Sequence, residues 1–293
     1  MRILHLDAGR EMRGGQWQVL RLMEGLRSAG VEFMLLARKD GPLFEAACDV
    51  GLPVDGLSLR KAVHWAFRVD MIHAHDARSH TLEALVHSRN LIVSRRVAFP
   101  IGSRWKYARA RHYIAVSEFV KSVLIQGGVP PEKISVVYDG VPVLQPAHGG
   151  AVLAPGNADD PLKGAPLALE AARLAGVELK LSTAIERDLP QAAMFVYITH
   201  SEGLGSGALL AMSAGVPVIA SNIGGLPEII EHRRTGLLVD NEPHAIAHAI
   251  RELRTDPELS QRLGAAARCR VMENFTVDLM VRRTMEVYRQ VLS

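Results

Sequence analysis

A chain of 293 residues, 48% hydrophobic and 22% charged, has enough apolar material for the cores of about two domains, and this balance excludes extended disorder. The 34 lysines and arginines nearly cancel the 31 aspartates and glutamates, so the net charge of +3 does not indicate a nucleic-acid-binding protein. Cys48 and Cys269 lie far apart without metal-ligand spacing, which argues against a disulfide framework and favours the cytoplasm. No apolar run is long enough for a transmembrane helix or a signal peptide, so we expect neither.

Basic residues gather at Arg95, Arg96 and residues 104–111. A cluster of this kind fits a phosphate-rich ligand or an anionic membrane surface, and the alternative is a solvated helix face. If the protein works at a membrane, we expect peripheral contact with its inner face.

Strands and helices alternate from the first residues onward. Residues 2–7 are rich in branched apolar side chains, which is typical of a buried strand, and apolar residues at spacings of three and four then predict a helix that Gly30 ends. Further strands are expected at residues 32–37, from residue 53, and at 71–75, 91–94, 113–116 and 134–138, with helices at 43–50 and 118–126. This alternation is typical of a parallel sheet covered by helices on both faces.

Residues 142–150 interrupt the alternation with two prolines and two glycines, which indicates a linker. A second series then predicts strands at 151–154, 178–181, 194–198, 217–220 and 236–239, and helices at 166–175, 207–214, 243–255, 257–273 and 277–292. We therefore predict an α/β protein with Rossmann-like domains at residues 1–145 and 151–275. A C-terminal helix within 276–293 is expected to pack back on the first domain.

A glycine-rich segment follows the predicted strand that ends near residue 199. Glu202 comes first, and Gly203, Leu204, Gly205 and Ser206 lead into a helix. Glycines let a backbone approach a ligand, and helix N-terminal amides suit a diphosphate, whereas the alternative is a tight turn without a ligand. Glu202 is placed at the carboxyl end of a strand, where α/β sheets bind their ligands.

Two further segments carry similar signals. Gly224 and Gly225 precede another helix and offer backbone amides, although simple turn chemistry also explains them. Lys163 precedes a helix, where its ammonium group would neutralise a diphosphate as charge develops on the leaving group, and a surface lysine is the alternative.

The first predicted domain offers a loop and a pair of histidines. Arg13, Gly14 and Gly15 connect the first strand and helix, but no complete Gly-x-Gly-x-x-Gly fingerprint is present, so nicotinamide dinucleotides are not indicated. Alternation places His73 and His75 on one side of a strand end. No Cys or Glu joins them at diagnostic spacing, so we expect no metal site and a ligand-facing or structural role instead.

Together these segments resemble glycosyltransferase family 4, the retaining enzymes of the GT-B fold, over essentially the whole chain. The similarity lies at residues 14–15, 70–75, 115–117, 129–134, 138–141, 202–205, 215–221, 224–228 and 235–239. It implies two Rossmann-like domains that face one another across a cleft, with the nucleotide held mainly by the C-terminal one.

The resemblance also implies roles for individual residues. Glu202 would bind donor-sugar hydroxyls, Lys163 would pair with the diphosphate, and His75 would lie near the reacting sugar and acceptor. The backbone of residues 204–206 would hold the sugar and diphosphate, and Gly15 would approach the phosphates. Neither a metal nor a cofactor would be required beyond the nucleotide-diphosphate sugar, which is the substrate. The basic residues at 104–111 favour a carbohydrate or lipid-linked acceptor, such as a cell-envelope glycan or a lipid-linked sugar.

Two departures from the family pattern bear on activity. The family has a second glutamate eight residues after the first, where this chain has Leu210, and the family's arginine before the Lys-Gly pair is replaced by Asn157 or Ala158. We expect a metal-independent retaining glycosyltransferase. The alternatives are a pseudoenzyme, or ligand-binding GT-B scaffold, without turnover, and another GT-B chemistry such as sugar-nucleotide epimerisation.

Overall fold

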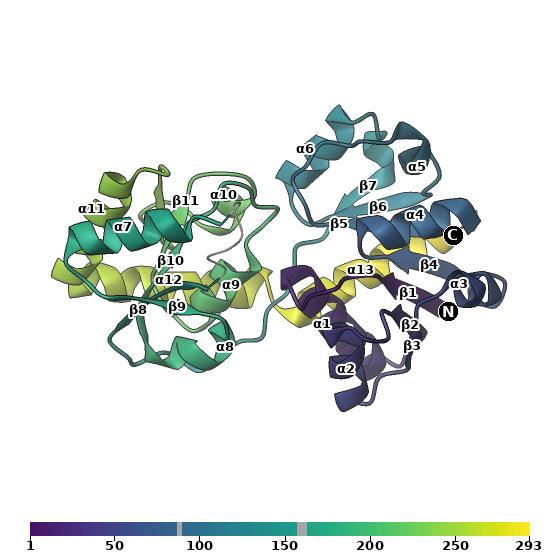
Figure 1. Cartoon of the computed structure of the whole chain (residues 1–293), viewed down its shortest axis with the longest axis horizontal. Coiled ribbons are helices and arrows are strands. Elements are labelled where there is room, and N and C mark those ends of the chain that lie inside the picture. The colour runs from purple at the N-terminus through teal and green to yellow at the C-terminus, as the bar shows by residue number, and fades with distance from the viewer. Residues whose placement is uncertain (87–89, 157–162) are drawn as a thin grey trace. The chain divides into compact units, whose positions relative to one another are not determined.

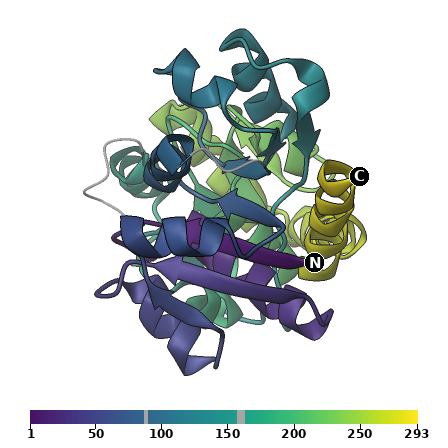
Figure 2. The same ribbon diagram turned by 90° about the vertical axis from the view of Figure 1, so that its right-hand side faces the viewer.

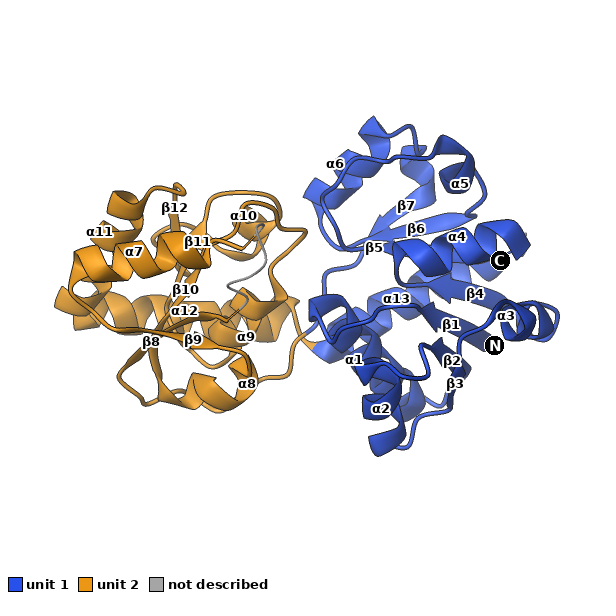
Figure 3. Ribbon diagram, in the orientation of Figure 1, with its two compact units in different colours: residues 1–140, 277–293 blue, residues 141–276 orange. Residues whose placement is uncertain are grey.

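The computed structural model describes residues 1–86, 90–156 and 163–293, and they divide into two compact units (Figure 3). Unit 1 comprises residues 1–140 and 277–293, and unit 2 comprises residues 141–276. Each unit contains one parallel sheet with helices, which confirms the prediction of two Rossmann-like domains (Figure 1).

Unit 1 is built on a seven-stranded sheet of order β3-β2-β1-β4-β5-β6-β7. Its strands are β1 (Arg2–Asp7), β2 (Glu32–Ala37), β3 (Val54–Gly56), β4 (Met71–Ala74), β5 (Leu91–Arg95), β6 (His112–Ala115) and β7 (Ile134–Val136). Its helices are α1 (Gly14–Ser28), α2 (Pro42–Asp49), α3 (Leu59–Ala66), α4 (Ala77–Val86), α5 (Arg104–Ala108), α6 (Glu118–Gln126) and α13 (Val277–Leu292), with a 3-10 turn, η1 (Pro131–Lys133).

The strand order reverses direction after β3, and this determines which face each helix covers. Right-handed crossovers place α1 and α2 on one face of the sheet and α3 to α6 on the other. The C-terminal helix α13, yellow in Figures 1 and 2, returns to unit 1 and packs against α1.

The packing of α13 explains a glycine in the middle of α1. A Cβ atom at Gly25 would lie 2.3 Å from Cγ2 of Val281, so the two helices approach too closely for any side chain there. Met280, Val281 and Tyr288 of α13 join the same apolar core as Leu22 of α1. Burial of this apolar surface holds α13 on unit 1.

Unit 2 is built on a five-stranded sheet of order β12-β11-β10-β8-β9. Its strands are β8 (Ala151–Pro155), β9 (Leu179–Ser182), β10 (Ala192–Tyr197), β11 (Val218–Ser221) and β12 (Leu237–Val239). Its helices are α7 (Ala165–Ala175), α8 (Ile185–Asp188), α9 (Ser206–Ser213), α10 (Leu226–Ile229), α11 (Pro243–Thr255) and α12 (Pro257–Asn274), with a 3-10 turn, η2 (Leu189–Gln191).

None of the helices formed by the described residues is long and apolar enough to span a bilayer.

Candidate functional site

Glu202 accepts hydrogen bonds from three groups just beyond the carboxyl end of β10. Its Oε2 accepts from Nζ of Lys163 at 3.0 Å and from the hydroxyl of Tyr197 at 2.6 Å, and its Oε1 accepts from the backbone N–H of Gly203 at 3.2 Å. The side chains of Lys163 and Glu202 are 24% and 15% exposed, so the ion pair is partly shielded from water. The structure thus brings together two residues that lie 39 positions apart in the sequence.

The hydroxyl of Tyr197 holds Glu202 in place beside Lys163. Burial, followed by the negative charge of Glu202, raises the pKa of Tyr197 well above its ordinary value, so its hydroxyl stays protonated and donates to the carboxylate. The ammonium group of Lys163 also lies 5.7 Å from the centre of the Tyr197 ring, within the range of a cation–π contact. Nothing in the sequence pattern singled out Tyr197, because it reads as one more apolar residue of a buried strand.

The backbone positions Lys163 beside the strand end. Lys163 pairs with Thr199 in an isolated antiparallel bridge, and the N–H of Gly164 donates to the carbonyl of Ile198 at 2.9 Å. A Cβ atom at Gly164 would lie 2.4 Å from Cγ2 of Ile198, which explains the glycine after the lysine.

The two glycine loops of unit 2 pack directly on each other. A Cβ atom at Gly224 would lie 2.1 Å from the carbonyl oxygen of Glu202, and one at Gly225 would lie 2.2 Å from that of Gly203. The N–H of Gly225 donates to the Glu202 carbonyl at 3.3 Å. These glycines therefore have a packing reason of their own, and the amide of Gly225 is already used within the protein.

The loop from Gly203 to Ser206 leads directly into α9. Gly205 adopts φ +108°, a conformation that favours glycine, and caps the helix, while Leu204 is buried. Ser206 begins α9 and is only partly buried. The first amides of this helix form the kind of N-terminus that suits an anionic group.

A hydrogen-bonded trio that the sequence analysis missed joins the ends of three strands. The side chain of Asn241 donates to the carbonyl of Thr199 at 2.9 Å and accepts from the hydroxyl of Ser221 at 2.5 Å. The N–H of Thr199 in turn donates to Ser221 at 3.0 Å. The trio holds the loop that carries Glu202 against β11 and β12.

Of the two departures from the family pattern, the one at Leu210 lies within the described residues. Leu210 is buried at 8% exposure in α9, so an apolar side chain fills the position of the second glutamate. Asn157 and Ala158 lie outside the described residues.

In unit 1, the carboxyl end of β1 leads into the N-terminus of α1. Asp7 accepts from the N–H of Gly9 at 2.8 Å and from the side chain of Gln16, which lies in the first turn of α1. Burial, followed by the nearby carboxylate of Asp76, raises the pKa of Asp7 to about 6. Asp76 itself accepts from the N–H of Ala8 at 2.6 Å, which ties the end of β4 to the end of β1.

The predicted loop residues Arg13, Gly14 and Gly15 lie at the start of α1. Arg13 is the N-cap residue, and its exposed guanidinium pairs with Glu11 at 2.7 Å; Gly14 and Gly15 are the first two helical residues. A Cβ atom at Gly15 would meet only Cδ of Arg96, at 3.7 Å, which is ordinary contact. The fold itself therefore does not require a glycine at position 15.

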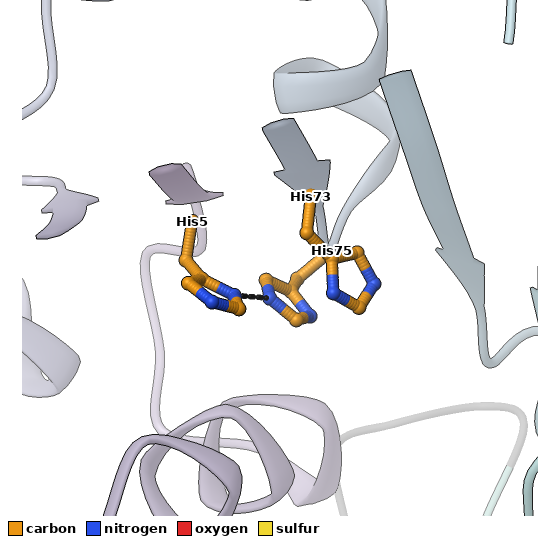
Figure 4. A group of neighbouring side chains, drawn as sticks. All are labelled: His5, His73 and His75. Atoms are coloured by element: carbon orange, nitrogen blue, oxygen red, sulfur yellow. Dashed lines mark hydrogen bonds between the residues drawn. The ribbon is translucent and has the colours of Figure 1, made fainter. Parts of the chain in front are cut away.

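His75 lies at the end of β4 within a cluster of three buried histidines (Figure 4). Its Nε2 is 3.0 Å from Nδ1 of His5, and its Nδ1 is 3.5 Å from a guanidinium nitrogen of Arg96. Arg96 also pairs with Asp139 at 3.3 Å. The sequence analysis missed His5, although the parallel register places His5 directly beside His73 on β1 and β4.

The partners of the cluster assign the protons on His75 and His5. Burial, reinforced by the positive charge of Arg96, lowers the pKa of His75 well below its ordinary value, and burial lowers that of His5 to about 3, so both rings are neutral. Since arginine only donates, Nδ1 of His75 accepts and its Nε2–H donates to His5. The remaining proton of His5 then lies on Nε2, which has no partner among the described residues.

The cluster has the composition of a metal site, but its hydrogen bonds favour another interpretation. The ligand atoms of His5, His73 and His75 lie within 4.8 Å of one another. However, His73 already contacts the hydroxyl of Tyr288 at 2.7 Å and that of Ser94 at 2.8 Å, so both of its nitrogens are engaged. We interpret the cluster as a hydrogen-bonded support for His75.

Comparison with known proteins gives the same family for both halves of the chain. Residues 12–143 match the model described as "Glycosyltransferase Family 4", and residues 161–270 match "Glycosyl transferases group 1". Among curated proteins, the chain is 29% identical over 198 residues to alpha-maltose-1-phosphate synthase of Mycobacterium tuberculosis, covering 58% of this chain and 51% of that protein. It is 40% identical over 98 residues to D-inositol 3-phosphate glycosyltransferase of Streptomyces avermitilis, covering 33% of this chain and 21% of that protein. The chain thus spans about a fifth to about a half of the length of these relatives.

Solved structures agree over nearly the full length. Anabaena HepE in complex with UDP and glucose superposes with a TM-score of 0.89 at 17% identity and covers 99% of both chains. Sucrose-phosphate synthase from Thermosynechococcus elongatus gives a TM-score of 0.79 at 19% identity, again over 99% of both chains. At these identities the likeness shows the GT-B fold, and together with the two family matches it establishes that the chain belongs to the group 1 glycosyltransferases of family 4.

Proposed function

We propose that the protein is a retaining glycosyltransferase that moves a sugar from a nucleotide-diphosphate donor to a carbohydrate or lipid-linked acceptor. The observation that carries the proposal is the convergence of Lys163, Tyr197 and Glu202 at a strand end beside the N-terminus of α9. This arrangement offers a cation and helix amides for a diphosphate and a carboxylate for sugar hydroxyls. Solved structures of Anabaena HepE hold UDP and UDP-glucose, which supports a donor of that class.

Binding of the donor would replace the ion pair by contacts with the ligand. Lys163 would release Glu202 and pair with the diphosphate, while Glu202, still held by Tyr197, would accept from sugar hydroxyls. After the exchange both charged groups remain hydrogen-bonded, so neither residue is left as an unsatisfied buried ion. Because a lysine and helix amides would neutralise the negative charge of the diphosphate, the reaction would need no metal ion.

Transfer with retention would then follow a front-face course. The bond between the anomeric carbon and the diphosphate oxygen breaks, and the bond to the acceptor oxygen forms on the same face. The acceptor proton passes to the departing phosphate oxygen, so no protein nucleophile is needed. His75, whose Nε2–H donates to His5, would orient hydroxyls of the reacting sugar or acceptor through Nδ1 once Arg96 turns from that nitrogen to the ligand.

The first experiment is thermal unfolding with UDP, GDP and ADP and with their sugars, in the presence and absence of EDTA. A nucleotide at one hundred times its Kd stabilises the folded state by about 2.7 kcal/mol, which corresponds to a rise in Tm of several degrees. Glu202→Gln and Lys163→Ala should reduce transfer at least tenfold. Lys180→Ala, which removes another lysine of unit 2 that pairs with Asp188, should not. Normal transfer by both site variants would refute these roles.

Leu210 favours the second candidate, a ligand-binding scaffold without turnover, because a buried leucine cannot accept a hydrogen bond from a ribose hydroxyl. If one nucleotide sugar raises the Tm selectively but no acceptor tested causes release of the nucleotide diphosphate, the protein is a binding scaffold. Conversion of the donor into an isomeric nucleotide sugar would instead identify epimerisation.

A further inference from the structure

The near-zero net charge of the chain conceals one strongly basic segment. Residues 57–111 contain eleven lysines and arginines but only three acidic residues, so this segment carries a net charge of +8, whereas the whole chain carries +3. The segment includes the helices α3, α4 and α5, which lie on the same face of the unit 1 sheet.

The three acidic residues do not neutralise the outer surface of this segment. Glu83 is fully buried, and Asp76 is used to cap the first turn of α4 through the N–H groups of Arg78 and Ser79. Asp70 lies at the start of β4, where it accepts from the N–H of Arg2 at 2.7 Å.

Four arginines of the segment remain available at the surface. Arg60, Arg78, Arg104 and Arg111 are exposed, and their guanidinium groups have no acidic partner within the described ranges. Since α3 packs against α4 and α4 packs against α5, we call these three helices, together with residues 109–111 that follow α5, the basic layer (Figure 1).

The basic layer also exposes large apolar side chains. Leu59 and Val63 of α3 and Phe67, the residue that follows its last turn, are spaced at intervals of four, so they form one ridge. They are 56%, 39% and 84% exposed. Neighbouring helices add Leu85 at 64% and Trp105 at 49% exposure. Such a helix face is the reverse of the ordinary pattern, in which the apolar ridge faces the core.

We propose that the outer face of the basic layer docks on an anionic phospholipid membrane. The exposed arginines match a negatively charged headgroup surface, and the apolar ridge of α3 reaches into the boundary between headgroups and acyl chains. Nucleic acid would satisfy the arginines but leaves Leu59 and Val63 without a matching surface, so the observations favour lipid. The proposal is independent of the transferase proposal, because it uses none of the residues around Glu202 or His75.

The test is co-sedimentation of the full chain with vesicles of phosphatidylcholine mixed with phosphatidylglycerol, and with vesicles of phosphatidylcholine alone. The protein should bind the mixed vesicles, less strongly as salt rises, and bind the neutral vesicles weakly. The variant with Arg60, Arg78, Arg104 and Arg111 changed to glutamine should lose at least about tenfold in partitioning. The variant with Leu59, Val63 and Phe67 changed to serine should also lose about tenfold.

A matched control removes the same charge elsewhere. Lys133, Arg262, Arg282 and Arg289 are exposed and lie outside the basic layer, so changing them to glutamine should leave vesicle binding nearly intact. Equal losses in the control and in the four-arginine variant, or full binding by the serine variant, would overturn the proposal. Binding of a DNA duplex that requires the four arginines, without binding to vesicles, would assign the surface to nucleic acid and also overturn it. The rise in Tm caused by nucleotides should be the same in these variants and in the wild type. A failure of vesicle binding can therefore be distinguished from a failure of the transferase proposal.

Discussion

The hydrogen bond from Tyr197 to Glu202 offers a direct test of the candidate donor site. Tyr197→Phe removes only the hydroxyl, whose oxygen lies 2.6 Å from the carboxylate. A hydrogen bond to a charged group contributes about 1.5–3 kcal/mol to stability, and Tyr197 is only 7% exposed, so a loss in this range is expected for the unliganded protein. Lys163 and the N–H of Gly203 still hold Glu202, and we therefore expect the fold to survive.

The same substitution should also change ligand binding. Once Lys163 turns to the diphosphate, Tyr197 is the side chain among the described residues that still holds Glu202 toward the sugar. We expect Tyr197→Phe to weaken binding of the nucleotide sugar about tenfold while binding of the nucleotide diphosphate alone changes little, because the diphosphate does not need Glu202.

Urea unfolding and isothermal titration measure the two quantities. Tyr113→Phe is the matched control, since Tyr113 is also buried and its hydroxyl donates to the carbonyl of Tyr107 at 2.6 Å within unit 1. It should cost about 1 kcal/mol of stability and leave sugar-nucleotide affinity unchanged. Equal affinities of the Tyr197→Phe variant and the wild type for the nucleotide sugar would refute the role of Tyr197 in positioning Glu202.

Three further predictions concern the loops, the histidine cluster and Asp7. Gly225→Ala places a Cβ atom 2.2 Å from the carbonyl oxygen of Gly203, so it should lower stability by about 1–3 kcal/mol in urea unfolding and shift the Glu202 loop; an unchanged midpoint would contradict this packing. His5→Phe removes the acceptor of the His75 Nε2–H, so kcat should fall while donor Kd stays constant, and a rise in Kd alone would contradict the positioning role. The pKa of Asp7 is raised from 3.8 to about 6 by burial, so the folded state binds the extra proton between these values and stability should fall by up to about 3 kcal/mol as pH rises through that window. Asp7→Asn should reduce the dependence of the free energy of unfolding on pH between pH 3.8 and about 6. The same dependence in the variant and the wild type would refute the raised pKa of Asp7.

The parts of the fold that follow ordinary burial patterns could be predicted from the sequence. The strands at the centre of each sheet are buried on both faces, and some of them stand out as continuous apolar runs, as for residues 33–37 and 192–197. The predicted helix at 43–50 is Pro42–Asp49 in the structure, and that at 207–214 is Ser206–Ser213, so helix ends differ by about one residue.

The apolar pattern of the sequence did not predict three helices of unit 1, and their burial and length explain why. The buried face of α4 consists of Ser79, His80, Glu83 and one alanine, so it lacks an apolar stripe. In α3 the apolar ridge faces outward, and Ala62 is the buried residue. The helix α5 covers only five residues, Arg104–Ala108, which is too short for periodicity to appear.

The candidate site was predictable only where a residue type indicated its chemistry. Glu202 and Lys163 were named from motifs, but Tyr197 and Asn241 were not, because a tyrosine in a buried strand and an asparagine in a loop carry no signal until the fold brings them to the strand ends. His5 is a similar case, since only the register between β1 and β4 places it beside His73, where its ring reaches His75.

The structure also separates glycines that the fold needs from one that it does not. At Gly224 and Gly225 a Cβ atom would collide with backbone oxygens, and at Gly205 the backbone adopts φ +108°, so packing and conformation explain these residues without any ligand. Gly15 is different, because a Cβ atom there meets only the flexible side chain of Arg96 at 3.7 Å, and alanine is the better helix former at this position. A glycine where the fold would accept alanine leaves room for a ligand to approach the backbone, and Gly15 lies at the N-terminus of α1 beside Arg96, where an anion would be stabilised. Of the glycines named from the sequence, Gly15 therefore gives the clearest independent reason to expect a phosphate-bearing ligand at unit 1.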